Sequence, residues 1–144
     1  MNANLVTATA LRVVTAAGLA VDAAIHLDLA PSQPPGGPGQ LSQTVLFNAE
    51  GVVAIVAALL VLTIGSRLSY AFAALVAGTA LAAVLVSRYA DVGAIGPLPD
   101  MYEPFWYLSK VTTTIAEAVA LLTALAGSVL REPVRRYWTQ PSWR

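Results

Sequence analysis

Residues 44–86 read TVLFNAEGVVAIVAALLVLTI, then GSR, then LSYAFAALVAGTALAAVLV. Both long runs are almost wholly apolar, and each is close to the roughly 20 residues that a helix needs to cross a bilayer. The three residues between them leave room only for a tight reversal of the chain. This stretch therefore predicts an antiparallel pair of membrane-spanning helices at 44–64 and 68–86.

Two further apolar stretches flank this pair, at 5–29 and 105–130. The chain of 144 residues is 57% hydrophobic and only 11% charged, whereas soluble domains carry about 25% charged residues. We predict one membrane domain over residues 1–144, an all-α, up-down four-helix transmembrane bundle. A cleaved signal peptide with Arg12 as its basic region is the alternative for the first stretch. Asp22 interrupts that apolar run, which favours a retained helix.

Small residues recur at helical spacing in the two central spans, where they would let helices approach closely. In the span at 44–64 the stripe runs through Glu50, Ala54, Ala57 or Ala58, and Val61. In the span at 68–86 it runs through Ala71, Ala74, Gly78 and Ala82. We expect both stripes to be helix–helix contacts.

Arginine and lysine are unevenly distributed between the two sides of the predicted bundle. One side has Arg12, Arg67 and a basic, aromatic tail at 131–144, while the other has only Arg88 and Lys110. Loops rich in these residues stay in the cytoplasm. We therefore expect both termini to be cytoplasmic, the two longer loops to face outward, and the protein to lie in the plasma membrane.

The residue counts exclude several classes of function. The chain has no cysteine, so thiol catalysis, iron–sulfur clusters and cysteine zinc sites are ruled out. It has a single histidine, so one chain cannot hold a haem between two histidines. The net charge of zero argues against nucleic acid as a partner. We expect no cofactor, and the absence of a recognisable serine nucleophile motif favours a protein without catalytic activity.

Five ionisable residues fall inside the predicted spans: Asp22, His26, Glu50, Lys110 and Glu117. Each costs about 2.5–3.5 kcal/mol on insertion scales, so such residues face the bundle interior and bind a partner. Asp22 and His26 are four apart on one helix face, and Thr114 shares a face with Lys110 and Glu117. In the predicted topology all of them enter from the outer side. We expect them to line one polar pocket in the outer half of the bundle.

Three functional interpretations of this cluster stay open. In the first, a non-catalytic protein binds a small molecule or lipid beneath an outer lid at 88–103, or docks a membrane complex as an accessory subunit. In the second, a proton- or ion-coupled carrier, active as a homo-oligomer, uses Glu117 as its coupling carboxylate. In the third and least favoured, a membrane enzyme uses Asp22, His26 and Glu50, which are also chemically suitable zinc ligands.

A purely structural network is the alternative to all three interpretations, because charges inside a membrane pair whatever their role. Lys110 would then pair with Glu50 or Glu117, and Asp22 with His26 or Arg88.

Three segments carry a resemblance to known proteins: AAIHLDLA at 23–30, LFNAEG at 46–51 and GPLPDMYEPFW at 96–106. They resemble segments of small four-helix membrane proteins of unknown function from actinobacteria, and the resemblance covers nearly the whole chain. In size and span count the chain is also similar in layout to DoxX-like membrane proteins. The resemblance implies a four-helix membrane fold and transfers no catalytic residue.

Overall fold

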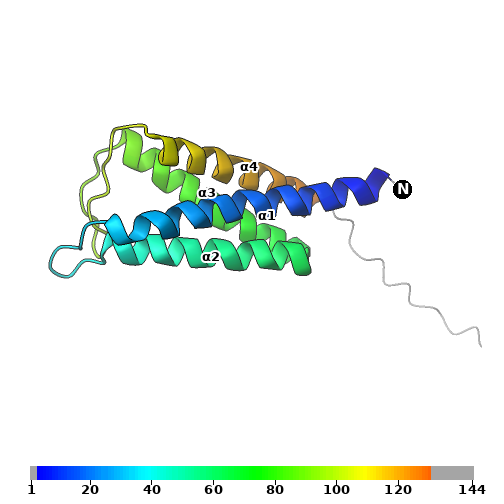
Figure 1. The fold of residues 1–144 in the computed structure, drawn as a ribbon, viewed down its shortest axis with the longest axis horizontal. Helices are drawn as coiled ribbons and strands as arrows, with labels where there is room; N and C mark the ends of the chain where they lie inside the picture. The colour runs from blue at the N-terminus through cyan, green and yellow to red at the C-terminus, as the bar shows by residue number, and fades with distance from the viewer. Residues whose placement is uncertain (1–2, 131–144) are drawn as a thin grey trace, which may run out of the picture.

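The computed structural model describes residues 3–130 of the chain. Figure 1 shows their four long helices, which are α1 (Ala3–Leu29), α2 (Gln43–Thr63), α3 (Arg67–Tyr89) and α4 (Leu108–Leu130). A short 3-10 helix, η1 (Ala30–Ser32), follows α1 directly. The described residues form no strand beyond one isolated bridge in the α3–α4 connection. The predicted all-α four-helix bundle is confirmed, and the predicted tail at 131–144 lies outside the described residues.

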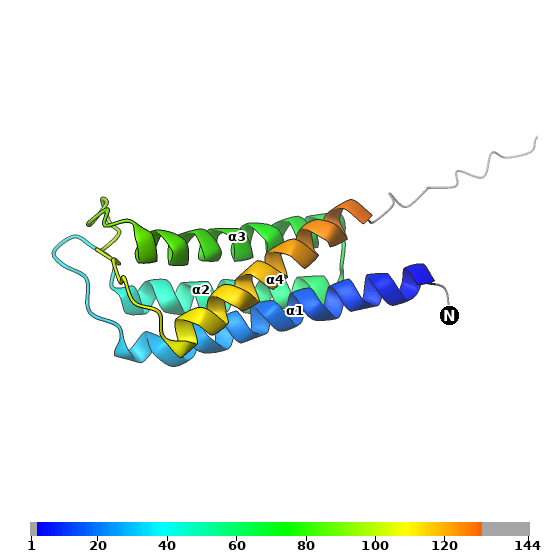
Figure 2. The same ribbon diagram turned by 90° about the horizontal axis from the view of Figure 1, so that it is seen from above.

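The helices alternate in direction, as Figures 1 and 2 show. Helix α1 packs against α2 and α4, and α3 packs against the same two helices, so α2 and α4 lie on opposite corners. The connections at 30–42 and 90–107 lie together at one end of the bundle, which we call the loop end. The start of α1 and the end of α4 lie at the other end. Each helix is long and apolar enough to cross a membrane.

The reversal between α2 and α3 is held by both helix ends and by α1. Ser66 caps α3, because its hydroxyl accepts the amide N–H of Ser69 at 3.1 Å. Gly65 has a φ of +55°, which glycine adopts readily, as is common after a helix end. Arg12 reaches over from α1 and donates to the carbonyl oxygen of Ile64 at 3.3 Å. The positive charge of Arg12 is also stabilising here, because it lies at the negative, carboxyl-terminal end of the α2 dipole.

Helix α4 begins at Leu108 rather than at residue 105, and α3 continues to Tyr89 rather than ending at 86. The residues before α4 are held out of a helix by contacts with the end of α3. The amide of Glu103 donates to the carbonyl oxygen of Ser87 at 2.8 Å. The ring of Trp106 meets the ring of Tyr89 edge-on, with centroids 6.3 Å apart. These tertiary contacts replace the first turn that the sequence pattern predicts.

The half of the bundle away from the loop end is packed with small residues. The buried residues of α2 are Gly51, Ala54, Ala57, Ala58 and Val61, which confirms the stripe predicted there except at Glu50, which is half-buried. The stripe predicted in α3 is wrong at Ala71 and Ala82, which are exposed, and right at Ala74, which is buried. The buried face of α3 also contains Tyr70, Ala73, Ala77 and Ala80. Alanine occurs on every face of α3, so spacing alone does not select the buried one.

Two glycines set how closely α4 approaches its neighbours. A Cβ atom on Gly18 of α1 would lie 2.8 Å from the backbone oxygen of Ala116 in α4. A Cβ atom on Gly127 of α4 would collide with the ring of Tyr70 in α3. Because membrane helices gain little from hydrophobic burial against lipid, close contact of this kind supplies much of their packing energy.

Candidate functional site: a polar cavity at the loop end

A cavity of about 550 Å³ lies at the loop end and is lined by residues of all four long helices. Much of its wall is apolar, from residues such as Leu29, Leu46, Phe47 and Ala83. Its polar lining includes Gln43, Glu50, Thr79, Ser87, Lys110 and Thr113. This is the size and composition of pockets that hold small organic molecules.

The α3–α4 connection covers part of this cavity, where Leu98, Met101 and Tyr102 line it. Two hydrogen bonds tie this connection to the start of α2. The amide of Leu41 donates to the carbonyl oxygen of Pro97 at 2.8 Å. The side-chain amide of Gln43 donates to the backbone oxygen of Asp100 at 2.9 Å. The two connections therefore form one layer over the end of the bundle.

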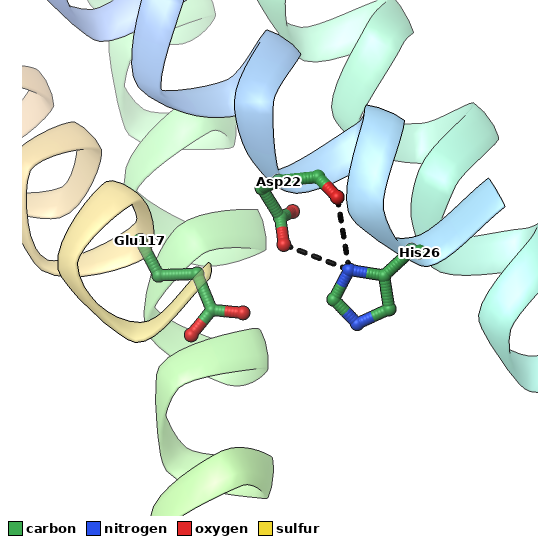
Figure 3. A group of neighbouring side chains, drawn as sticks. All are labelled: Asp22, His26 and Glu117. Atoms are coloured by element: carbon green, nitrogen blue, oxygen red, sulfur yellow. Dashed lines mark hydrogen bonds and ion pairs between the residues drawn. The ribbon is translucent and has the colours of Figure 1, made fainter. Parts of the chain in front are cut away.

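Asp22 and His26 form an ion pair on α1 beside the cavity. Their spacing of one helical turn places Nδ1 of His26 at 2.8 Å from Oδ1 of Asp22 and 3.1 Å from its backbone oxygen. Asp22 is fully buried, while His26 lines the cavity and packs against the ring of Phe47 at 5.1 Å. Figure 3 shows that Nε2 of His26 lies on the side of the ring away from Asp22. Asp22 thus orients the imidazole ring through Nδ1 and makes no contact with Nε2.

Glu117 of α4 faces this pair, and Thr113 links the two acids. The Thr113 hydroxyl lies 2.8 Å from Oδ1 of Asp22 and 3.3 Å from Oε1 of Glu117. Glu117 is fully buried, and it does not line the cavity itself. One atom from each of Asp22, His26 and Glu117 lies within 4.8 Å of the others. The three donors come from two helices that pack directly together.

The two buried carboxylates have fewer hydrogen-bond donors than acceptor atoms. Oδ2 of Asp22 and Oε2 of Glu117 have no hydrogen-bond partner. The single hydroxyl proton of Thr113 can serve only one carboxylate at a time. Two negative charges within 4.8 Å of each other would repel by about 3.5 kcal/mol or more at an effective dielectric constant of about 20. A protonated His26 supplies one positive charge, so a further proton or a cation is needed to balance the pair.

Lys110 does not pair with Glu50 or Glu117, which corrects the structural network proposed from the sequence. Its ammonium donates to the backbone oxygen of Glu103 at 2.7 Å and lies 3.6 Å from the Glu103 carboxylate. Tyr107 donates to the same carboxylate at 3.0 Å. Partial burial and this hydrogen bond raise the pKa of Tyr107 to about 12. The partner of Lys110 is therefore a residue of the α3–α4 connection, outside the span.

Glu50 and Arg88 also lack the partners that the structural network predicted for them. Glu50 lines the cavity, and its Oε1 is buried with no hydrogen-bond partner. Arg88 does not pair with Asp22, since its guanidinium stacks on the rings of Tyr89 at 4.9 Å and Trp106 at 5.7 Å. Asp100 and Glu103 also line the cavity, but their carboxylates have partners in the α3–α4 connection and in α4, so Glu50 is the lining acid with a buried oxygen that lacks a hydrogen-bond partner.

Thr114 is replaced by its neighbour Thr113 in the site. The Thr114 hydroxyl donates to the backbone oxygen of Lys110 at 2.6 Å, within its own helix, and Thr114 does not line the cavity. The sequence contained a signal for Thr113, because it stands four residues before Glu117 and so shares its face. The role of Glu103 had no such signal, since its contact with Lys110 depends on the path of a connection.

No known family model, curated protein or solved structure matches the chain. The function is therefore argued from the geometry of the cavity and its charged neighbours.

Proposed function

We propose that this membrane protein binds a small amphiphile in the loop-end cavity, with an apolar body and a cationic or hydrogen-bond-donating head. The observation that carries the proposal is the unpartnered Oε1 of Glu50 in a cavity of about 550 Å³ whose wall is otherwise largely apolar. A buried acceptor without a donor costs about 1–3 kcal/mol. A ligand that donates to Glu50 would recover that energy.

The sign of the head group follows from the charges around the cavity. The acidic side chains in the wall are Glu50, Asp100 and Glu103, and Asp22 and Glu117 are joined to the wall through Thr113. The cation in the wall, Lys110, is already engaged by Glu103. The balance favours a positive head group over a negative one.

We also propose an orientation of the bundle in the membrane. The arginine distribution supports cytoplasmic termini in the plasma membrane, and in that orientation the loop end faces outward. The cavity would then receive its ligand from the outer leaflet or the external solution. We also propose that the chain is related to small actinobacterial membrane proteins. It would work beside a protein partner or a second copy of itself.

The test is the binding of a long-chain primary amine to the full chain in mild detergent, measured by native mass spectrometry. We expect the amine to bind one to one and a carboxylic acid of equal chain length to bind at least ten-fold more weakly. Glu50→Gln should weaken amine binding by a similar factor. Asp28→Asn removes an exposed acid near the same end and should not. Equal binding of the two amphiphiles, or of Glu50→Gln and the wild type, would refute the proposal.

A proton-coupled carrier is the second candidate, favoured by the buried Asp22–Glu117 pair with its two unpartnered oxygens. A carboxylate inside a membrane span is a common place for a coupling proton. In proteoliposomes, the amphiphile found by mass spectrometry would be taken up in response to a pH gradient. Glu117→Gln should then stop uptake while leaving binding intact. Binding without gradient-driven uptake in the wild type would leave the binding protein as the function.

A further inference from the structure

Asp22, His26 and Glu117 share a feature that the amphiphile site does not use: two carboxylates and an imidazole that converge at one point. One donor atom from each residue lies within 4.8 Å of the others. Figure 3 shows both carboxylates directed into the space between α1 and α4 in which the His26 ring stands. We propose that these three residues bind a first-row divalent transition-metal cation such as Zn²⁺.

The unpartnered oxygens are the observation that points to a cation. Asp22 and Glu117 are both completely buried, yet Oδ2 of Asp22 and Oε2 of Glu117 accept no hydrogen bond. Buried polar atoms in native proteins nearly always have a partner, and a site for a bound ion is one physical reason for an exception. Lys110 is not that partner, because Glu103 engages it. A divalent cation would satisfy both acids at once.

The kind of donor selects the kind of cation. Two carboxylates and one imidazole match the ligand sets of Zn²⁺, Fe²⁺ and Mn²⁺, whereas Mg²⁺ and Ca²⁺ prefer oxygen alone. Ligands held about 2.0 Å from zinc in a tetrahedron lie about 3.3 Å from one another. Nδ1 of His26 and Oδ1 of Asp22 are 2.8 Å apart, near that spacing. Binding would replace the proton between them and draw Glu117 inward.

The cavity supplies both a route to this site and room for a further ligand. His26 and Thr113 line the cavity and also contact the buried acids. These two side chains separate the cavity from the two carboxylates, so a cation would enter from the loop end by displacing them. A water molecule from the cavity or the Thr113 hydroxyl would complete the coordination, as in zinc sites with three protein ligands. Glu50 lies outside the three-residue cluster, so its replacement would remove the proposed amphiphile contact without removing a metal ligand.

The experiment is a titration of the chelator-treated full chain in mild detergent with Zn²⁺, followed by calorimetry, with Mg²⁺ as the comparison cation. We expect one Zn²⁺ per chain and at least ten-fold weaker affinity in Asp22→Asn, His26→Gln and Glu117→Gln. Two matched acid-to-amide controls, Asp28→Asn and Glu50→Gln, should keep wild-type affinity. Mg²⁺ should not compete at equal concentration.

A second measurement covers the case in which a site variant fails to fold. X-ray absorption of the zinc-loaded wild type should show a shell of nitrogen and oxygen neighbours that includes one imidazole. The proposal is overturned if the wild type binds no stoichiometric Zn²⁺, if folded Glu117→Gln binds it as tightly as the wild type, or if the zinc shell contains no imidazole. Retention of zinc binding by Glu50→Gln together with loss of amine binding would separate this site from the proposed amphiphile site.

Discussion

Replacing Gly18 by alanine should destabilise the bundle, because this position sets the distance between α1 and α4. A Cβ atom there would lie 2.8 Å from the backbone oxygen of Ala116, whereas ordinary contact begins at 3.4 Å. Because a backbone oxygen cannot rotate away, the two helices must part by about 0.6 Å. A gap of 0.5–1 Å removes a quarter to a half of the dispersion energy of the contacts that it opens.

The matched control for this change is Gly78→Ala in α3. A Cβ atom on Gly78 would meet only the side chain of Leu121, at 3.5 Å, which is ordinary contact. Both substitutions gain about 1 kcal/mol of helix propensity on scales measured in water. Gly18→Ala must also bear an overpacking cost of about 1–3 kcal/mol. We therefore expect Gly18→Ala to be less stable than Gly78→Ala by roughly that cost.

The assay is reversible unfolding of both variants in mixed micelles, followed by circular dichroism. We expect Gly18→Ala to unfold at a lower denaturant fraction than the wild type, and Gly78→Ala at an equal or higher one. The reasoning also predicts weaker zinc binding in Gly18→Ala, because Asp22 and Glu117 stand on the two helices that part. Equal stability of the two alanine variants would show that the α1–α4 contact is not as close as the structure has it.

Three further predictions concern individual side-chain hydrogen bonds. Thr113→Val should cost about 1–3 kcal/mol because a buried carboxylate loses its donor, whereas Thr114→Val, whose hydroxyl bonds only within its own helix, should change the unfolding free energy little. Arg12→Met should cost about 0.5–1 kcal/mol in the same unfolding assay through loss of the cation at the end of α2, and a change in zinc affinity would contradict this local role. The pKa of Tyr107 is raised to about 12, so the folded state binds the phenol proton more tightly than the unfolded state does. The resulting contribution to stability is present below about pH 10 and is lost as the pH rises through about 12. Tyrosinate absorbance of the wild type compared with Tyr107→Phe should show this titration, and Glu103→Gln should lower its midpoint pH.

The helices were predictable from the sequence because apolar length alone identifies a membrane span. The boundary of α4 was not, since Trp106 packs on Tyr89 and Glu103 bonds to the end of α3, and both contacts are made across the fold. The buried face of α2 was predictable because its other faces carry bulky residues such as Leu59 and Leu62. In α3, with alanine all round, the choice of face depends on which neighbours it meets.

For the candidate site, the sequence identified which charges enter the bundle but not how they pair. The one-turn spacing of Asp22 and His26 made their contact predictable from helix geometry. The partner of Lys110 was not predictable, because the long ammonium side chain reaches back seven residues to Glu103. Likewise, the sequence grouped Glu50 with Asp22 and His26, whereas the structure brings Glu117 into that cluster because α1 packs directly on α4.

The close packing away from the loop end makes the two halves of the bundle differ in whether a small molecule can enter them. Leu19, Ala57, Ala73 and Ala120 are almost completely buried there, and the hydroxyl of Thr15 bonds across to Thr123 at 2.8 Å. The cavity is lined by residues of the loop-end half of the bundle, so in this conformation a molecule bound there stays on one side of the packed half. A binding protein can work in this single conformation. A carrier would have to open the packed half in every cycle, and if α1 and α4 part there, Gly18→Ala should change its transport rate because it loosens their contact.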